Sequence, residues 1–320
     1  MKPRHKYDRG IALLATLLAI SLMTLLVVEF STSAALGYRA AANQADELRA
    51  YYLARSGIQV GLALLAQDSV NKSRAKHQYE SLDQVWAQPI PPIPVDRGMV
   101  SMSIVDEDRK LNINKLFNQQ KREPDEQFAA IVTRLLSNIG LSPALVPILI
   151  DWLDPDSIES DGGAEADYYL RLIPPYEPRN GPMPTIGDLR TLKGMDDITF
   201  LRLSRYLTTL DVGTGPCCIN ANTALPEVLA ALTPELEDNA DLVKQIVDVR
   251  DIRPFSQITD LLNLPGISAI SEHIKSLLNV TSQDFLITGQ GDFAGTRKRI
   301  YATFRRSQNG TALLLSWHED

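Results

Sequence analysis

A continuous apolar run near the N-terminus constrains this chain more than any other feature. It extends from Ile11 to Val28, and the first carboxylate after it is Glu29. The hydroxyl residues that interrupt it are Thr16, Ser21 and Thr24. A run of this length can cross a bilayer as a single helix. The basic residues that precede it are Lys2, Arg4, Lys6 and Arg9. Because a basic flank stays in the cytoplasm, the C-terminal bulk is predicted to lie on the far side of the membrane.

Three kinds of targeting segment compete for this stretch. A secretory signal could be cleaved at the small residues between Ser31 and Ala35, but its apolar core usually has only about 7–15 residues. An ordinary signal anchor needs no glycine at its cytoplasmic edge, where Gly10 stands directly before Ile11. A charged leader, a glycine and then an aliphatic residue that opens the span resemble a prepilin leader. This resemblance implies that prepilin peptidase cuts between Gly10 and Ile11 and methylates the new N-terminus, while the apolar helix stays in the mature protein.

The fifth residue after this cleavage point is Ala15. Most pilins and pseudopilins carry glutamate at that position, and a carboxylate in lipid needs a partner. The partner is thought to be the N-terminal amine of the neighbouring subunit. Ala15 needs no such partner, and within these families the absence of the acid resembles a subunit at the filament tip, with no subunit beyond it.

Composition excludes some classes of function. The net charge of −7 and the pI near 5.2 argue against a nucleic-acid-binding protein, which needs clustered Lys and Arg. The only cysteines are the neighbours Cys217 and Cys218. Two cysteines cannot form a disulfide framework, so their redox state stays open.

The span is predicted to continue as a longer helix. A helical period persists through about Gln67, so residues 11–67 would form one helix roughly 85 Å long. Residues 68–98 are polar and then proline-rich, which indicates a surface connection. The alternation from Met99 to Val105 predicts the first strand.

Strand patterns return only near the C-terminus. They cover Asp284–Thr288, Arg299–Arg305 and Thr311–Trp317, with turns predicted at Asp292–Gly295 and Gln308–Gly310. A largely helical region separates them from the first strand. Strands that share a sheet across such a block imply an insertion, so the predicted fold class is α+β, with helices lodged inside a small head.

The helical region contains a weak internal duplication. Residues Leu111–Asn114 match Cys218–Thr223, and residues Asp188–Met195 match Asp260–Ile267. Each half would run from an Asn-bearing segment, through helices, to a helix–tight turn–helix. A glycine in each turn, Gly194 or Gly266, permits the positive φ that a sharp turn requires.

This layout resembles the general secretion pathway protein K family of minor pseudopilins in type II secretion, over nearly the whole chain. The segments that carry the resemblance are Arg9–Leu14 with Ala15, Ala50–Ala54, Asp106–Asn114, Asp151–Asp154 with Gly163–Glu165 and Tyr168–Tyr169, and Asn220–Ala224. The resemblance implies a pilin-like fold, a long N-terminal transmembrane helix plus an antiparallel sheet. Two all-α domains, similar to sterile alpha motifs (SAM-like) or to helix–hairpin–helix modules, would be inserted into it.

The expected domains follow from this resemblance. They are a prepilin leader (1–10), the pilin helix (11–67), a linker with the first strand (68–105), a first helical domain with an acidic loop (106–212), a second helical domain (213–282) and the C-terminal strands (283–320). The implied place is a bacterial inner membrane, with a periplasmic C-terminal domain. The implied role is to initiate or cap a pseudopilus that exports folded proteins. The implied partners are minor pseudopilins I, J and H, prepilin peptidase and the inner-membrane secretion platform.

The loop from Asp151 to Asp167 is the most informative polar cluster. Its carboxylates are Asp151, Asp154, Asp156, Glu159, Asp161, Glu165 and Asp167, and Gly162 and Gly163 allow tight backbone. Oxygen ligands without His or Cys suit Ca²⁺ better than Zn²⁺. The spacing fails the EF-hand rule, because Ile158 stands where a third ligand should be, and a solvated acidic turn is the competing interpretation. The family resemblance also implies metal here. The favoured structural Ca²⁺ ligands are Asp154, Asp156, Glu165 and Asp167, followed by Asp151 and Glu159.

Other functions find weaker support. The Leu264–Ile267 turn is similar to helix–hairpin–helix modules that grip DNA, so a membrane-anchored DNA-uptake protein is the alternative function. However, Ser268 replaces the usual second glycine and few positive charges lie nearby. The four histidines sit in unrelated contexts, and no nucleophile elbow or Walker loop occurs. We therefore expect no enzyme and no nucleic-acid ligand.

Overall fold

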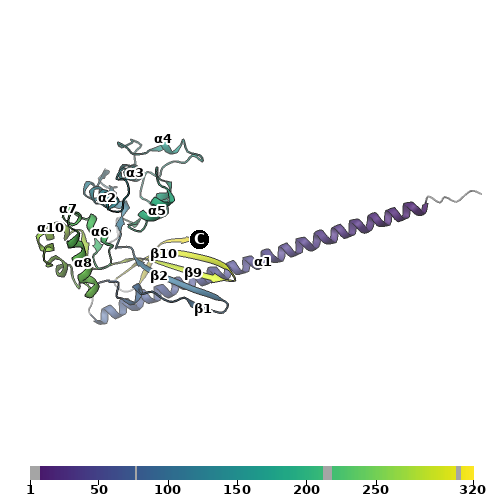
Figure 1. Cartoon of the computed structure of the whole chain (residues 1–320), viewed down its shortest axis with the longest axis horizontal. Coiled ribbons are helices and arrows are strands. Elements are labelled where there is room, and N and C mark those ends of the chain that lie inside the picture. Colours follow the sequence, from purple (N-terminus) through teal and green to yellow (C-terminus); the bar gives the residue numbers. More distant parts are fainter. Residues whose placement is uncertain (1–7, 76–77, 212–217, 308–310) are drawn as a thin grey trace, which may run out of the picture.

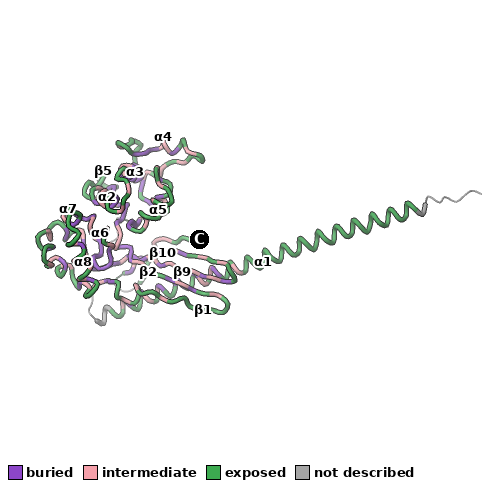
Figure 2. Tube along the Cα trace, viewed as in Figure 1, coloured by how far each residue is buried: buried purple, intermediate pink, exposed green. Residues whose placement is uncertain are grey.

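The structure is a computed structural model that describes residues 8–75, 78–211, 218–307 and 311–320. The leader before Asp8, Cys217 and the predicted turn Gln308–Gly310 lie outside the described residues. A long helix, α1 (Asp8–Ala75), projects far from the rest of the molecule (Figure 1). Its N-terminal half is exposed throughout, and Figure 2 shows this as an unbroken green tube. Within the described residues, Gly10–Asn71 is the one segment long and apolar enough to span a membrane, so the predicted apolar helix is confirmed.

Helix α1 continues past Gln67, where we expected it to end, and runs to Ala75. No glycine or proline occurs between Gly61 and Pro89 to stop it. The polar residues that suggested a surface connection instead form hydrogen bonds within the helix and an ion pair with the head. Ser69 donates to the carbonyl of Leu65, and Asp68 forms a buried ion pair with Arg306 at 3.0 Å.

The head is a five-stranded antiparallel sheet in the order β1-β2-β9-β10-β11. Its strands are β1 (Ile93–Val95), β2 (Gly98–Asp106), β9 (Asp284–Phe293), β10 (Thr296–Arg306) and β11 (Ala312–Glu319). The pairing of Ile104 with Ile287 joins β2 directly to β9, which confirms that the first strand shares a sheet with the C-terminal strands. The β9–β10 turn is tighter than predicted, since Asp292 still lies in β9. Strand β1 was missed because it lies in the proline-rich stretch.

Helix α1 packs closely on β9 because both surfaces carry small residues. Ala50, Ala54 and Ile58 are fully buried beneath the sheet. A Cβ placed on Gly289 would lie 2.2 Å from the Ala54 carbonyl oxygen, and one on Gly291 would lie 2.0 Å from the Ala50 carbonyl oxygen. The head core also contains Trp86, from the short 3-10 helix η1 (Val85–Ala87), and Phe285 in edge-to-face contact with it.

The insertion between β2 and β9 is mostly helical. Its first unit contains α2 (Glu126–Asn138), α3 (Leu145–Leu153), α4 (Ala166–Tyr169) and α5 (Asp197–Leu203), with 3-10 helices η2 (Ile113–Leu116) and η3 (Ile186–Thr191). Its second unit contains α6 (Pro226–Ala231), α7 (Pro234–Glu237), α8 (Ala240–Ile252), α9 (Ile258–Leu262), α10 (Ser271–Ile274) and η4 (Ile267–Ile270). The likeness of these units to sterile alpha motifs stays a prediction.

The units are not purely helical as we expected, because short ladders close them. Strand β3 (Leu111–Asn112) pairs in parallel with β6 (Leu207–Thr208), and β7 (Ile219–Asn220) pairs in parallel with β8 (Leu278–Asn279). A third ladder joins β4 (Phe117–Asn118) and β5 (Glu123–Pro124). Each parallel ladder ties the start of a unit to its end, so the two units share one topology.

Side-chain contacts repeat in the same way. Asn114 exchanges two hydrogen bonds with the backbone of Met183, at 2.8 and 2.9 Å. Asn222 does the same with Phe255, at 2.9 and 3.0 Å. A capping box follows Met183 and another follows Phe255: Thr185 pairs with Asp188 in the first, and Gln257 pairs with Asp260 in the second. Gly194 and Gly266 then turn the chain with φ of 75° and 80°. The structure thus shows the duplication that the sequence only suggested.

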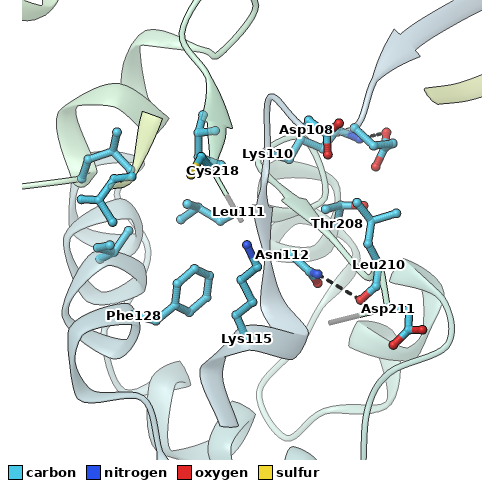
Figure 3. Close-up of a pocket in the computed structure, with 15 residues that line it drawn as sticks. Asp108, Lys110, Leu111, Asn112, Lys115, Phe128, Thr208, Leu210, Asp211 and Cys218 are labelled. Carbon is cyan, nitrogen blue, oxygen red and sulfur yellow. Dashed lines mark hydrogen bonds and ion pairs between the residues drawn. The ribbon is translucent and has the colours of Figure 1, made fainter. Parts of the chain in front are cut away.

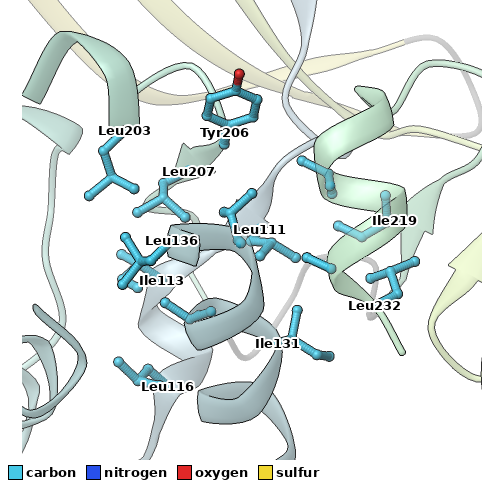
Figure 4. Close-up of a cluster of buried hydrophobic side chains, with 14 of the residues drawn as sticks. Leu111, Ile113, Leu116, Ile131, Leu136, Leu203, Tyr206, Leu207, Ile219 and Leu232 are labelled. Carbon is cyan, nitrogen blue, oxygen red and sulfur yellow. The ribbon is translucent and has the colours of Figure 1, made fainter. Parts of the chain in front are cut away.

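The two units form one body rather than two separate ones. A single cluster of buried apolar side chains runs through both, and Figure 4 shows Leu111 and Ile131 of the first unit facing Ile219 and Leu232 of the second. Arg134 on α2 also donates to the carbonyls of Ala231 and Leu232 at the end of α6. We call this unit pair the helical body; its core is distinct from the head core.

Candidate functional site

The acidic loop begins in the last turn of α3 and ends where α4 begins. It brings together Asp151, Asp154 and Glu165, whose carboxylate oxygens lie within 4.8 Å of one another. All three side chains are buried, with exposures of 0%, 6% and 3% respectively. We call these three residues the carboxylate triad.

The backbone of the loop wraps around Asp151. Its Oδ2 accepts a hydrogen bond from the Ala164 N–H at 2.8 Å, and both of its oxygens accept from the Ser160 N–H at 3.1 and 3.2 Å. A Cβ placed on Gly163 would lie only 1.9 Å from Asp151 Oδ2. Gly163 is therefore required for the loop to close over this carboxylate.

The other two members of the triad lack comparable partners. Both carboxylate oxygens of Glu165, and Oδ1 of Asp154, have no hydrogen-bond partner among the described residues. Burial raises the pKa of Glu165 to about 7, and the charges of Asp154 and Asp151 add to the rise. Burial also raises the pKa of Asp154 to about 6, with Asp156 and Asp151 contributing. Buried, converging and unpartnered carboxylate oxygens are the donor set that a hard cation prefers, so the residues present fit Ca²⁺.

The remaining predicted ligands are not brought into the triad. Asp156, Glu159 and Asp167 are exposed. Asp156 accepts from the Ile158 N–H at 2.8 Å, which turns its carboxylate back along the loop, and Asp167 lies in the first turn of α4. Asp151, which ranked below Asp156 and Asp167 by sequence, is instead central to the site. The geometry therefore favours a first set of three protein ligands: Asp151, Asp154 and Glu165.

The residues predicted for N-terminal processing, together with Ala15, lie near the start of α1. Gly10, Ile11 and Ala15 are exposed on the first turns of α1. They lie at the far end of the helix from the head (Figure 1). Cleavage between Gly10 and Ile11 stays a prediction.

A small cavity lies between the two units, beside Cys218 (Figure 3). It has a volume of about 70 Å³, and its lining includes Leu111, Lys115 and Phe128. Cys218 points its thiol to the Ser276 carbonyl at 3.2 Å. This space accommodates at most a few waters, so it does not compete with the triad as a ligand site.

The Gly266 hairpin does not favour the DNA-binding alternative. His273 pairs with Glu235 at 3.0 Å, and Lys275 pairs with Glu272 at 2.5 Å. These positive candidates beside the turn therefore face carboxylates of the protein. A phosphate-binding surface needs uncompensated positive charge.

Sequence reasoning missed the polar contacts that join the head to the helical body. The strand predicted to end at Val105 continues to Asp106, and Asp106, Glu107 and Asp108 are all buried. Their signal was present in the run of three acids at the end of a predicted strand. Burial of the run could not be inferred without knowing what packs on it.

Comparison with known proteins agrees with the fold and the motifs. Two family models described as type II secretion system protein K match residues 109–212 and 219–281. A type II secretion system protein K from Klebsiella pneumoniae is 30% identical over 293 residues, which cover 88% of this chain and 87% of that protein. One from Pseudomonas aeruginosa is 26% identical, covering 95% of this chain and 90% of that protein.

A solved structure shares the fold. The GspK-GspI-GspJ complex of the type 2 secretion system from enterotoxigenic Escherichia coli contains a chain that matches with a TM-score of 0.73 at 20% identity. The match covers 88% of this chain and 99% of that chain. Together with the K. pneumoniae relative, the long apolar helix and the interrupted sheet, these matches show that the chain belongs to the type II secretion system protein K family.

Proposed function

We propose that this chain is the minor pseudopilin at the tip of the type II secretion pseudopilus, where it initiates or caps assembly for export of folded proteins across the outer membrane. The observation that carries the proposal is the position of the helical body. It lies at the end of the head away from the exposed half of α1 (Figure 1). A further subunit stacked on that end would meet the helical body.

The membrane half of α1 supports the same role. Ala15 stands at the fifth position after Gly10, and no carboxylate occurs between Ile11 and Val28. The helix therefore lacks the acid that would bind the N-terminal amine of a successor. In this proposal prepilin peptidase removes residues 1–10, α1 anchors the chain in the inner membrane, and the head and helical body lie in the periplasm.

The proposed partners follow from the family. The related chain from enterotoxigenic E. coli was solved in a complex with GspI and GspJ. We infer that this chain assembles with its own pseudopilins I and J, with pseudopilin H beneath them, on the inner-membrane secretion platform.

We further infer that the carboxylate triad holds a structural Ca²⁺. The support is the set of orphaned buried oxygens on Glu165 and Asp154. When bound, the cation would neutralise the charge of the triad and cross-link the end of α3 to the start of α4. Ser160 and Ala164 orient Asp151 through their N–H groups.

A tip position can be tested in the source bacterium by labelling an exposed cysteine introduced into the helical body and imaging isolated pseudopili. Label at one end of each fibre supports the proposal. Label along the fibre sides contradicts it.

Mass spectrometry of the membrane fraction tests the prepilin leader and should give Ile11 as the N-terminal residue. An intact leader, or an N-terminus near Ser33, contradicts the prepilin leader.

A further inference from the structure

The internal duplication provides a built-in comparison for the acidic loop. In the second unit, α8 ends at Ile252 and the chain reaches Phe255, the partner of Asn222, almost at once. In the first unit, α3 ends at Leu153, and the equivalent residue Met183 follows only after the whole acidic loop and α4. The acidic loop is therefore an insertion into one copy of a repeated unit.

The tight turn differs between the two copies at one informative position. Asp188 and Gly194 of the first unit correspond to Asp260 and Gly266 of the second at the same spacing. By that correspondence Lys193 occupies the position of Pro265. The unit that carries the acidic loop has a long cationic side chain here, and the unit without it has a side chain with no donor.

Lys193 uses that side chain to hold the loop. Its Nζ donates a hydrogen bond of 2.7 Å to the carbonyl oxygen of Gly163 and lies 5.1 Å from the centre of the Tyr168 ring. Its backbone N–H contacts the hydroxyl of Tyr169 at 3.4 Å. The half-buried ammonium thus contacts the loop just before Glu165 and the helix just after it.

The contact with Gly163 has a direct consequence for the triad. Gly163 is followed by Ala164, whose N–H donates to Asp151. The next residue is Glu165, whose carboxylate oxygens have no hydrogen-bond partner among the described residues. A charge-assisted hydrogen bond to this carbonyl fixes the peptide that connects the two ligands. Outer-shell bonds of this kind orient ligands and alter metal affinity about 10–100-fold when removed.

We propose that Lys193 is a positioning residue for the carboxylate triad, which sets the affinity of the site for a divalent cation by fixing the Gly163 carbonyl, without itself contacting the cation. This proposal rests on the proposed Ca²⁺ site. The direction in which Ca²⁺ affinity changes when Lys193 is removed is informative, because the ammonium carries positive charge. Through charge alone, Lys193 would repel Ca²⁺, and its removal would tighten binding. Through positioning, its removal weakens binding.

The test compares the full-length protein in detergent with two variants, Lys193→Met and Lys193→Arg. Lys244→Met is the control, since this exposed lysine on α8 of the second unit pairs with Asp248 at 4.0 Å. Isothermal titration with Ca²⁺ should show about tenfold weaker binding for K193M, partial recovery for K193R and no change for K244M. Unchanged or tighter binding by K193M overturns the proposal.

A second measurement separates this proposal from the Ca²⁺ site itself. Amide hydrogen exchange over Ser160–Glu165, measured in chelator, should be faster in K193M than in the wild type and near wild type in K193R. If the wild type binds no Ca²⁺, the Ca²⁺ proposal fails, while the exchange result still decides whether Lys193 organises the loop. Equal exchange in K193M and the wild type contradicts the positioning role.

Discussion

Asp106, the last residue of β2, accepts a hydrogen bond of 2.5 Å from the hydroxyl of Thr223 in the second helical unit. The same carboxylate accepts from the hydroxyl of Ser282 at 2.6 Å and from Asn220 at 3.3 Å. These four residues form what we call the junction cluster, which joins the head to the helical body. Nearby, Glu80 accepts from the Ser282 N–H and pairs with Arg306, which also binds Asp68. Polar contacts thus connect two bodies whose apolar cores are separate.

The junction cluster predicts an unusual pH dependence of stability. Burial raises the pKa of Asp106 from 3.8 to about 6, with the charge of Glu80 contributing. Between about pH 3.8 and about pH 6, the Asp106 carboxyl is therefore protonated in the folded chain and ionised in the unfolded chain. The ionised carboxylate therefore lowers the free energy of unfolding above about pH 6, and this penalty is relieved as the pH falls through about 6. The full effect is about 3 kcal/mol, since the pKa rises by about two units and one unit is worth about 1.4 kcal/mol.

Denaturant unfolding of the wild type and Asp106→Asn, followed from about pH 7 to about pH 5, measures this effect. The wild type should gain stability relative to the variant on acidification. Glu177→Gln, at an exposed position, is the control and should track the wild type. Parallel pH profiles for the wild type and Asp106→Asn would show that Asp106 does not titrate in this range.

Calcium should stabilise the chain through the carboxylate triad. At a hundredfold excess over its dissociation constant, a ligand specific for the folded state adds about 2.7 kcal/mol, so the melting temperature should rise with Ca²⁺ and fall with chelator. Asp154→Asn should abolish most of the rise. Asp161→Asn, exposed in the same loop, should keep it. A chelator-insensitive melting temperature of the wild type argues against the site.

Calcium binding should also weaken in acid. The pKa of Glu165 is about 7 and that of Asp154 about 6 without metal, so protons compete with the cation as the pH falls through this window. Titration calorimetry should show lower affinity near pH 5 than near pH 8 and proton release on binding at neutral pH. Constant affinity across the window contradicts the assignment of these two ligands.

Gly163→Ala should disrupt the triad more than its small volume suggests. The new Cβ would lie 1.9 Å from Asp151 Oδ2, so the loop or the carboxylate must move, at a cost of about 1–3 kcal/mol. We expect lost Ca²⁺ binding and a lower melting temperature. Gly181→Ala is the matched control, because its Cβ would meet only the Arg179 carbonyl oxygen at 3.9 Å. Wild-type behaviour of G163A would mean that the loop is not closed over Asp151.

Gly291→Ala should separate α1 from the sheet. Its Cβ would fall 2.0 Å from the Ala50 carbonyl oxygen and 2.6 Å from the Ala54 backbone nitrogen, and backbone on both sides leaves little room to relax. Limited proteolysis should cut the α1–head junction faster than in the wild type. Gly37→Ala, with nothing within 4 Å of the added methyl, should cut at the wild-type rate; equal rates for all three proteins would contradict this packing.

Much of the fold could be predicted from sequence because it depends on local patterns. The apolar residues from Ile11 to Val28 predict a membrane-spanning helix. The alternation of apolar and polar residues predicts β2, whichever strands pair with it in the sheet. The end of α1 could not be placed, because polar residues such as Asp68 favour a loop until Arg306 is known to meet them. Strand β1 was hidden by Pro94 and by the prolines just before the strand; an edge strand tolerates proline.

The sequence by itself determined the long apolar helix and the interrupted α+β layout, and it suggested the repeated units, since each depends on residue type and spacing along a short stretch. Only the tertiary structure decided which acids converge. Asp151, Asp154 and Glu165 lie together, whereas Asp156 and Asp167 are exposed. Asp106 accepts a hydrogen bond from Thr223, which follows the whole first helical unit in the sequence. The physical reason is that burial and electrostatic coupling depend on distances through space, and the long-range packing of the helical body and of the head sets those distances.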